Sequence, residues 1–175
     1  MRLASVLARG QRIQDALVIS EELIKALGPT WAADMLSLPA LGSAETMSNY
    51  ELQFFHSYLS RRIELAEQHG DKRLLAIAHY NFGNFSRRYL GHDVAFYHYQ
   101  RARHIDPDYD ARRYFRTELA GILFELGHYS ISAKLYETCL ANPERSDVEA
   151  LYADALMFSG QYSKAHEAFA NYLDK

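Results

Sequence analysis

Histidine and cysteine are the residues of this chain whose side chains most readily bind metals or attack substrates. The chain contains eight histidines and one cysteine, Cys139. No His-Glu-x-x-His motif occurs, no two histidines stand four residues apart, and no second cysteine stands at zinc-ligand spacing from Cys139. The sequence also lacks a glycine-rich phosphate loop. We therefore predict no catalytic residue, no metal site and no cofactor, and we expect that the protein is not an enzyme.

Arginine and aromatic residues could instead hold a nucleic acid. The segment 101–116 ("RARHIDPDYDARRYFR") combines five arginines with Tyr109, Tyr114 and Phe115, and such a mixture can stack on and neutralise a single strand. Three aspartates interrupt the segment, and the net charge of the chain is −3. RNA or DNA binding through 101–116 is therefore the weaker alternative to a protein partner.

Charge is also distributed unevenly along the chain. Residues 71–116 hold nine Lys or Arg against five acidic residues, whereas residues 117–175 hold four against nine. A locally basic middle is thus followed by an acidic end.

Length and composition favour one soluble domain. The chain has 175 residues, of which 49% are hydrophobic, enough for a single domain with a sizeable core. A lone cysteine allows no internal disulfide, and we find neither a signal peptide nor an apolar run long enough to cross a membrane. These features predict a cytoplasmic protein without a membrane partner.

The elements that position these residues are predicted to be helices. Only four prolines and nine glycines interrupt the chain, and no run alternates between apolar and polar residues as a strand would. Apolar residues recur at helical spacing in 12–27, and again in 48–69, where Ser48 can cap the helix and Gly70 can end it. Residues 28–47 are less regular, with one short helix expected near 31–37.

A repeat of about 35 residues runs through the second half of the chain. "YLGHDVAFYHY" at 89–99 returns as "ELGHYSISAKLY" at 125–136 and as "FSGQYSKAHEAF" at 158–169. The repeated features are a small residue, a glycine and an aromatic residue at Gly83, Gly91 and Tyr99, at Ala120, Gly127 and Tyr136, and at Ala153, Gly160 and Phe169. Each unit therefore reads as a helix, a glycine turn and a second helix.

These residues resemble the tetratricopeptide repeat. The unit 76–107 carries the likeness best, through "AHYNFGN", Ala95, Tyr99, Ala102 and the closing "IDP". The resemblance implies an all-α fold, a right-handed α-α superhelix of antiparallel helix pairs. It implies one helical-repeat domain over 1–175, with degenerate helices in 1–70 and units at 71–109, 110–145 and 146–175. In such arrays Gly83, Ala95, Tyr99 and Ala102 pack helix against helix, and Cys139 replaces a buried alanine.

The resemblance also implies a function, namely binding a peptide or helix of another protein in a concave groove. By helical spacing and by analogy with the family, we predict that the groove is lined by Tyr80, Asn81, Asn84, Arg87, Arg88, Tyr114, Thr117, Glu118 and Asp154. The protein would then be a scaffold, an adaptor or a regulatory domain. Tetratricopeptide chaperones of type III secretion, which have similar size and acidity, and a peptide-sensing domain of a larger protein are the alternatives.

Two further expectations concern the partner. Family members that clamp a C-terminal carboxylate do so with Lys and Arg, but the corresponding positions here are Glu118, Asp147 and Leu151. An acidic tail is therefore not the expected ligand, and a basic or mixed segment fits better. The last helix, ending in "AFANYLDK", would expose an apolar edge, which predicts self-association through that helix, coverage by another protein, or a longer natural chain.

Overall fold

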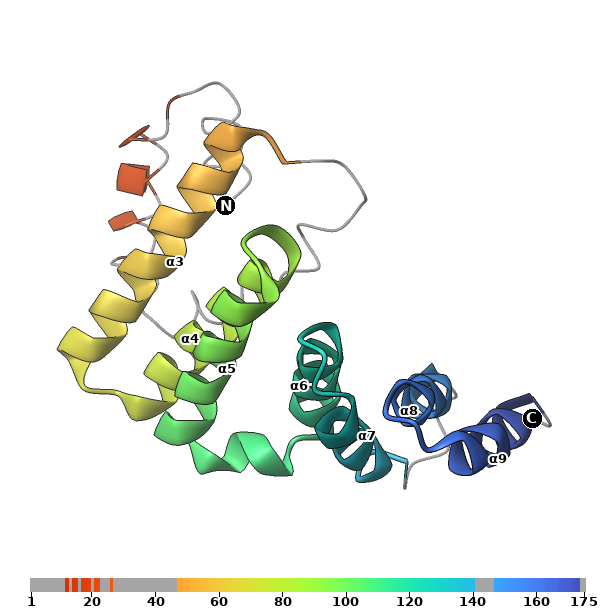
Figure 1. Ribbon diagram of the computed structural model, residues 1–175. Coiled ribbons are helices and arrows are strands. Elements are labelled where there is room, and N and C mark those ends of the chain that lie inside the picture. The colour runs from red at the N-terminus through yellow and green to blue at the C-terminus, as the bar shows by residue number, and fades with distance from the viewer. Residues whose placement is uncertain are drawn as a thin grey trace. The chain divides into compact units, whose positions relative to one another are not determined.

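The computed structural model describes residues 12, 14, 15, 17–19, 21, 22, 26, 47–140 and 147–173. All regular secondary structure in these ranges is helical (Figure 1). The predicted all-α class is therefore confirmed for the part of the chain that is described. The short helix expected near 31–37 lies outside these residues, and so does Pro143.

The first long helix, α3 (Asn49–His69), begins and ends where its sequence predicts. The Ser48 hydroxyl accepts a hydrogen bond from the backbone N–H of Glu51, and the Glu51 carboxylate accepts one from the backbone N–H of Ser48. This reciprocal pair satisfies two N–H groups that have no partner inside the helix. Gly70 ends α3 with a φ of 69°, a left-handed conformation that glycine adopts without strain.

Three helix pairs follow α3. They are α4 (Lys72–Tyr89) with α5 (His92–Ile105), α6 (Arg113–Glu125) with α7 (Tyr129–Glu137), and α8 (Asp147–Phe158) with α9 (Tyr162–Leu173). A short 3-10 helix, η2 (Pro107–Ala111), precedes α6. We call α4, α6 and α8 the first helices and α5, α7 and α9 the second helices.

The repeated glycines stand at the turns inside these pairs. Gly91, Gly127 and Gly160 all have positive φ angles, which a residue with a side chain rarely adopts. The predicted pattern of helix, glycine turn and second helix is confirmed in all three units.

Close packing within the first pair depends on Gly83. A Cβ atom built at this position would overlap the ring of Tyr99 on α5. Tyr99, Ala95 and Ala102 have no exposed surface. Gly83 and Tyr99 therefore pack α4 against α5, and the expected burial of Ala95 and Ala102 is confirmed.

The chain divides into two compact units, Met1–Asp106 and Pro107–Lys175. The core of the first unit is mainly aromatic and joins α3 to α4 through Phe54, Phe55, Tyr58, Leu59, Phe82 and Phe85. The core of the second unit uses smaller side chains, Ala120, Ala133, Tyr136, Cys139, Val148, Ala155, Leu156 and Ala165. Each unit thus has its own apolar core.

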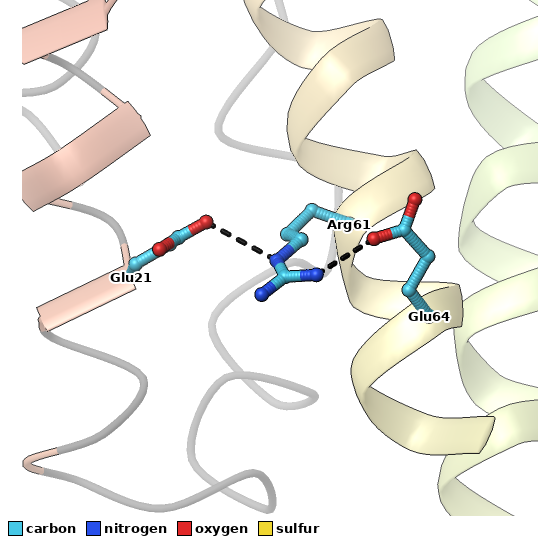
Figure 2. Close-up of polar contacts among 3 residues, drawn as sticks. All are labelled: Glu21, Arg61 and Glu64. Carbon is cyan, nitrogen blue, oxygen red and sulfur yellow. Dashed lines mark hydrogen bonds and ion pairs between the residues drawn. The ribbon is translucent and has the colours of Figure 1, made fainter. Parts of the chain in front are cut away.

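An ion-pair network connects α3 to the N-terminal residues that the structure describes. Arg61 on α3 donates from Nε to Glu21 at 3.2 Å and from Nη1 to Glu64 at 2.7 Å (Figure 2). Glu21 belongs to the predicted helix 12–27, whose described residues are helical from position 14 onward. Because these side chains are more than one-third exposed, the network contributes little to stability.

Candidate interaction surface on the first helices

Of the three predicted groove residues in the middle of α4, Tyr80 and Asn84 contact Tyr99 of their own helix pair, and Asn81 is buried. The ring of Tyr80 stacks on Tyr99, with centroids 5.5 Å apart, and the Tyr99 hydroxyl donates a hydrogen bond to Oδ1 of Asn84. Asn81 is only 7% exposed. A ligand could engage these side chains only alongside the contacts that they already make, so their part in binding stays a prediction.

The two arginines at the end of α4 are more accessible. Arg88 is exposed, and its guanidinium lies 5.6 Å from the centroid of the Tyr89 ring. Arg87 is partly buried. Cations in the last turn of a helix are favoured by the helix dipole, so local structure explains both residues without a ligand.

On α6 the predicted residues have three different environments. Tyr114 is 47% exposed, while Thr117 donates its hydroxyl hydrogen to the carbonyl oxygen of Arg113, one turn earlier. Glu118 is partly buried. Of these three residues, Tyr114 therefore offers the most contact area to another molecule.

On α8, Asp154 lies between two apolar side chains that face outward. Leu151 is 40% exposed and Phe158 is 55% exposed, and the spacing of 151, 154 and 158 puts all three residues on one side of the helix. Because α6 and α8 contact each other, residues on their outer sides can form one surface within the second unit. We call Tyr114, Glu118, Leu151, Asp154 and Phe158 the α6–α8 surface.

The aromatic cluster behind Phe158 was not among the predicted site residues. Phe124, at the end of α6, lies edge-on to Phe158 with ring centroids 5.3 Å apart. Tyr129, at the start of α7, is 5.2 Å from both rings. Phe158 itself occupies a groove position by helical spacing, but its contacts with Phe124 and Tyr129 have no signature in the sequence.

Two histidines form a buried polar contact inside the α4–α5 pair. Nδ1 of His79 and Nδ1 of His98 are 3.0 Å apart, and both residues are buried. Burial is the main cause that lowers the pKa of each imidazole to about 4, and neighbouring cationic groups contribute to the same shift, namely His98 and Arg101 for His79 and His56 for His98. Both rings are therefore neutral at physiological pH.

The tautomers of this pair follow from the remaining ring nitrogens. Two neutral imidazoles can share a hydrogen bond between their Nδ1 atoms only if one Nδ1 carries a proton and the other does not. Nε2 of His79 is buried and has no hydrogen-bond partner in the described part of the protein. A proton on that nitrogen would be unsatisfied, so we infer that His79 carries its proton on Nδ1 and donates it to His98.

Cys139 is buried, as expected for a residue that replaces an alanine. It belongs to the core of the second unit, and its thiol lies 3.4 Å from the carbonyl oxygen of Leu135. Among the described residues, no group of three or more His, Cys, Asp or Glu side chains is placed to hold a metal ion. None of the described helices is both long enough and apolar enough to span a bilayer.

Self-association was predicted on the last helix, α9. In α9, Tyr162 and Leu173 are largely exposed, and Ala165 is the buried contact. Phe169 and Tyr172 are partly exposed. Self-association through this face stays a prediction.

Comparison with known proteins identifies the fold. No protein-family model and no curated protein sequence matches the chain. Among solved structures, the crystal structure of MamA protein is similar with a TM-score of 0.58 and 15% identity, over 99% of this chain and 88% of that one. A Podosopora anserina putative kinesin light chain with nearly identical TPR-like repeats is similar with a TM-score of 0.52 and 15% identity, over 99% and 91% of the two chains. The predicted tetratricopeptide-like array of helix pairs is thereby confirmed as the fold.

Proposed function

We propose that this protein is a non-catalytic interaction module that binds a peptide or a helix of another protein on its first helices. The fold supports a role in protein interaction, because helix pairs of this kind stack on one another and leave the outer sides of their first helices available to a partner, as α6 and α8 do in the second unit. The α6–α8 surface is the observation that carries the proposal. There, two successive first helices contact each other and leave Tyr114, Leu151 and Phe158 40–55% exposed.

Large exposed apolar side chains favour a protein ligand over a solvated face. Tyrosine and phenylalanine supply contact area while losing little conformational entropy when bound. Such residues commonly act as anchors at the centre of protein interfaces. On the α6–α8 surface, Glu118 and Asp154 would then contribute orientation and selectivity, and the residues predicted on α4 are a separate proposal for the first unit. The finer roles of scaffold, adaptor or regulatory domain share this mode of binding.

Site-specific photo-crosslinking in cells tests the proposal. The photoreactive residue p-benzoylphenylalanine is placed at position 114 or 151 on the α6–α8 surface and, as a control, at position 131 on α7. Ile131 is a suitable control because it is also apolar and 55% exposed but lies on a second helix. We expect protein adducts from positions 114 and 151 that survive nuclease treatment and are absent from position 131. Adducts that disappear with nuclease, or that form equally at position 131, would overturn the proposal.

A further inference from the structure

The outer side of α8 combines acidic and large apolar side chains in a single stripe. Asp147, Leu151, Asp154 and Phe158 are spaced by four, three and four residues, which places them on one side of the helix. Asp147, Leu151 and Phe158 are exposed, and Asp154 is partly exposed. The helix carries three acidic residues and no Lys, Arg or His. A ligand of this stripe must therefore be compatible with both negative charge and apolar surface.

Phe158 can serve as an apolar contact for a partner, but its ring cluster does not form an aromatic cage that could enclose a small ligand. Phe124, Tyr129 and Phe158 contact one another pairwise, with ring centroids 5.2–5.3 Å apart. Rings this close leave no room for a small cation or ligand between them. A partner can therefore contact only the solvent-exposed side of the Phe158 ring, because Phe124 and Tyr129 pack against the rest of it. Such a rigid apolar surface suits an aliphatic or aromatic side chain from a partner.

The charge around this anchor is negative. Asp154 lies one turn before Phe158 on α8, and the exposed Glu125 follows Phe124 on α6. The cations of α6, Arg113 and Arg116, lie at the opposite end of that helix, where Nε of Arg113 donates to the carbonyl oxygen of Cys139. In the described part of the second unit, nine acidic residues stand against five Lys or Arg. The field near Phe158 therefore favours a basic ligand.

We propose that the α6–α8 surface, together with the exposed Asp147 at the start of α8, binds a basic amphipathic helix of a partner protein. Apolar side chains of the partner pack on Phe158 and Leu151, and its Lys or Arg side chains pair with Asp154 and Asp147. Seven residues separate the two apolar positions, a rise of about 10.5 Å along α8, so the partner needs apolar residues two turns apart on one side. This inference names the partner chemistry of the surface in the proposed function and rests on that function.

Fluorescence anisotropy with three synthetic peptides tests the inference. The probes are labelled helical peptides of about fourteen residues: a Leu/Lys amphipathic peptide, the same peptide with Glu for Lys, and the same peptide with Ala for Leu. We expect the Leu/Lys peptide to bind at least about tenfold more tightly than either of the others. Its affinity should fall as salt is raised, because exposed ion pairs are screened.

Matched variants locate the binding on this surface. Phe158→Ala and Leu151→Ser should each weaken the Leu/Lys peptide about tenfold, since each removes an apolar contact. Asp154→Asn should weaken it several-fold and reduce the dependence on salt. The controls Ile131→Ala on α7 and Glu167→Gln on α9, both at exposed positions, should bind as the unchanged protein does. Because Phe158 also packs on two rings, Leu151→Ser is the variant that tests the surface without disturbing the cluster, and circular dichroism checks the fold of each variant.

Three results would overturn the inference. They are equal binding of the Lys and Glu peptides, equal binding of the Leu/Lys and Ala/Lys peptides, and an equal loss in the control variants. If crosslinks from position 114 persist while the Leu/Lys peptide fails to bind, the partner chemistry is wrong and the proposed function stands. If those crosslinks are also absent, the proposed function fails as well.

Discussion

At the scale of single residues, the His79–His98 pair should make the stability of the α4–α5 packing depend on pH. The hydrogen bond between the two Nδ1 atoms exists only while the pair holds one shared proton at that position. Each neutral ring already carries one proton, so a second proton at this contact would make one imidazole cationic and turn two N–H donors toward each other inside the α4–α5 pair, with Arg101 also acting on His79. Acid should therefore weaken this region of the protein through the histidines.

The free energy of unfolding should decrease as the pH falls from about 6.5 to about 4. The unfolded chain binds protons on both histidines near their ordinary pKa of 6.5, whereas the folded pKa values are about 4. Between these values the unfolded state holds more protons, so stability is lost as the pH falls, by up to about 3 kcal/mol for one histidine. Urea denaturation at a series of pH values measures this loss.

His98→Gln should reduce that pH dependence, because it leaves a single buried imidazole to titrate. His166→Gln is the control, since His166 is exposed on α9 and its replacement should leave the dependence unchanged. If His98→Gln lost as much stability between these pH values as the unchanged protein, the buried pair would not be its source.

Single residues also show which contacts the sequence could predict. The packing role of Gly83 and Tyr99 and the burial of Cys139 followed from the repeat pattern and its family resemblance. The contact of His79 with His98 and the hydrogen bond from Tyr99 to Asn84 did not, because each joins side chains on different helices whose rotation about their axes the sequence leaves open. The same applies to Phe124, Tyr129 and Phe158, which come from three different helices.

At the scale of elements, local capping fixes where helices begin. Asp71 caps α4, since its carboxylate accepts hydrogen bonds from the backbone N–H groups of Arg73 at 2.9 Å and Leu74 at 3.1 Å. The contacts lie within three residues along the chain, as do those between Ser48 and Glu51 in α3. Because such interactions are local, the start of a helix can be predicted from sequence, and the predicted boundaries of 48–69 agree closely with α3.

Asp71→Ala should destabilise the protein by about 1 kcal/mol, the usual contribution of an N-cap side chain. Asp71→Asn should cost much less, because the amide oxygen can accept the same hydrogen bonds. Urea denaturation of the two variants at neutral pH measures both values. Equal destabilisation by Ala and Asn would show instead that Asp71 acts through its charge on the helix dipole.

At the scale of the whole molecule, the chain comprises two compact units with separate apolar cores. The first unit joins α3 to α4 around an aromatic core, and the second joins α6 to α9 around smaller side chains. The repeats predicted the helix pairs, but they did not predict that the chain divides after Asp106. That division depends on which helices pack most extensively, a property of three-dimensional contacts rather than of spacing along the chain.

Hydrogen exchange should show that a packing defect in one unit stays in that unit. Gly83→Ala introduces a Cβ that overlaps Tyr99, so it should destabilise α4 and α5 by about 1–3 kcal/mol and raise amide exchange in 72–105. Exchange in 147–173 should not change, because stability in repeat arrays is largely a sum of local terms. The matched variant Ala153→Val overpacks the corresponding buried position on α8 and should have the reverse pattern. If each variant accelerated exchange equally in both units, the array would unfold as one cooperative body, and the local account would be wrong.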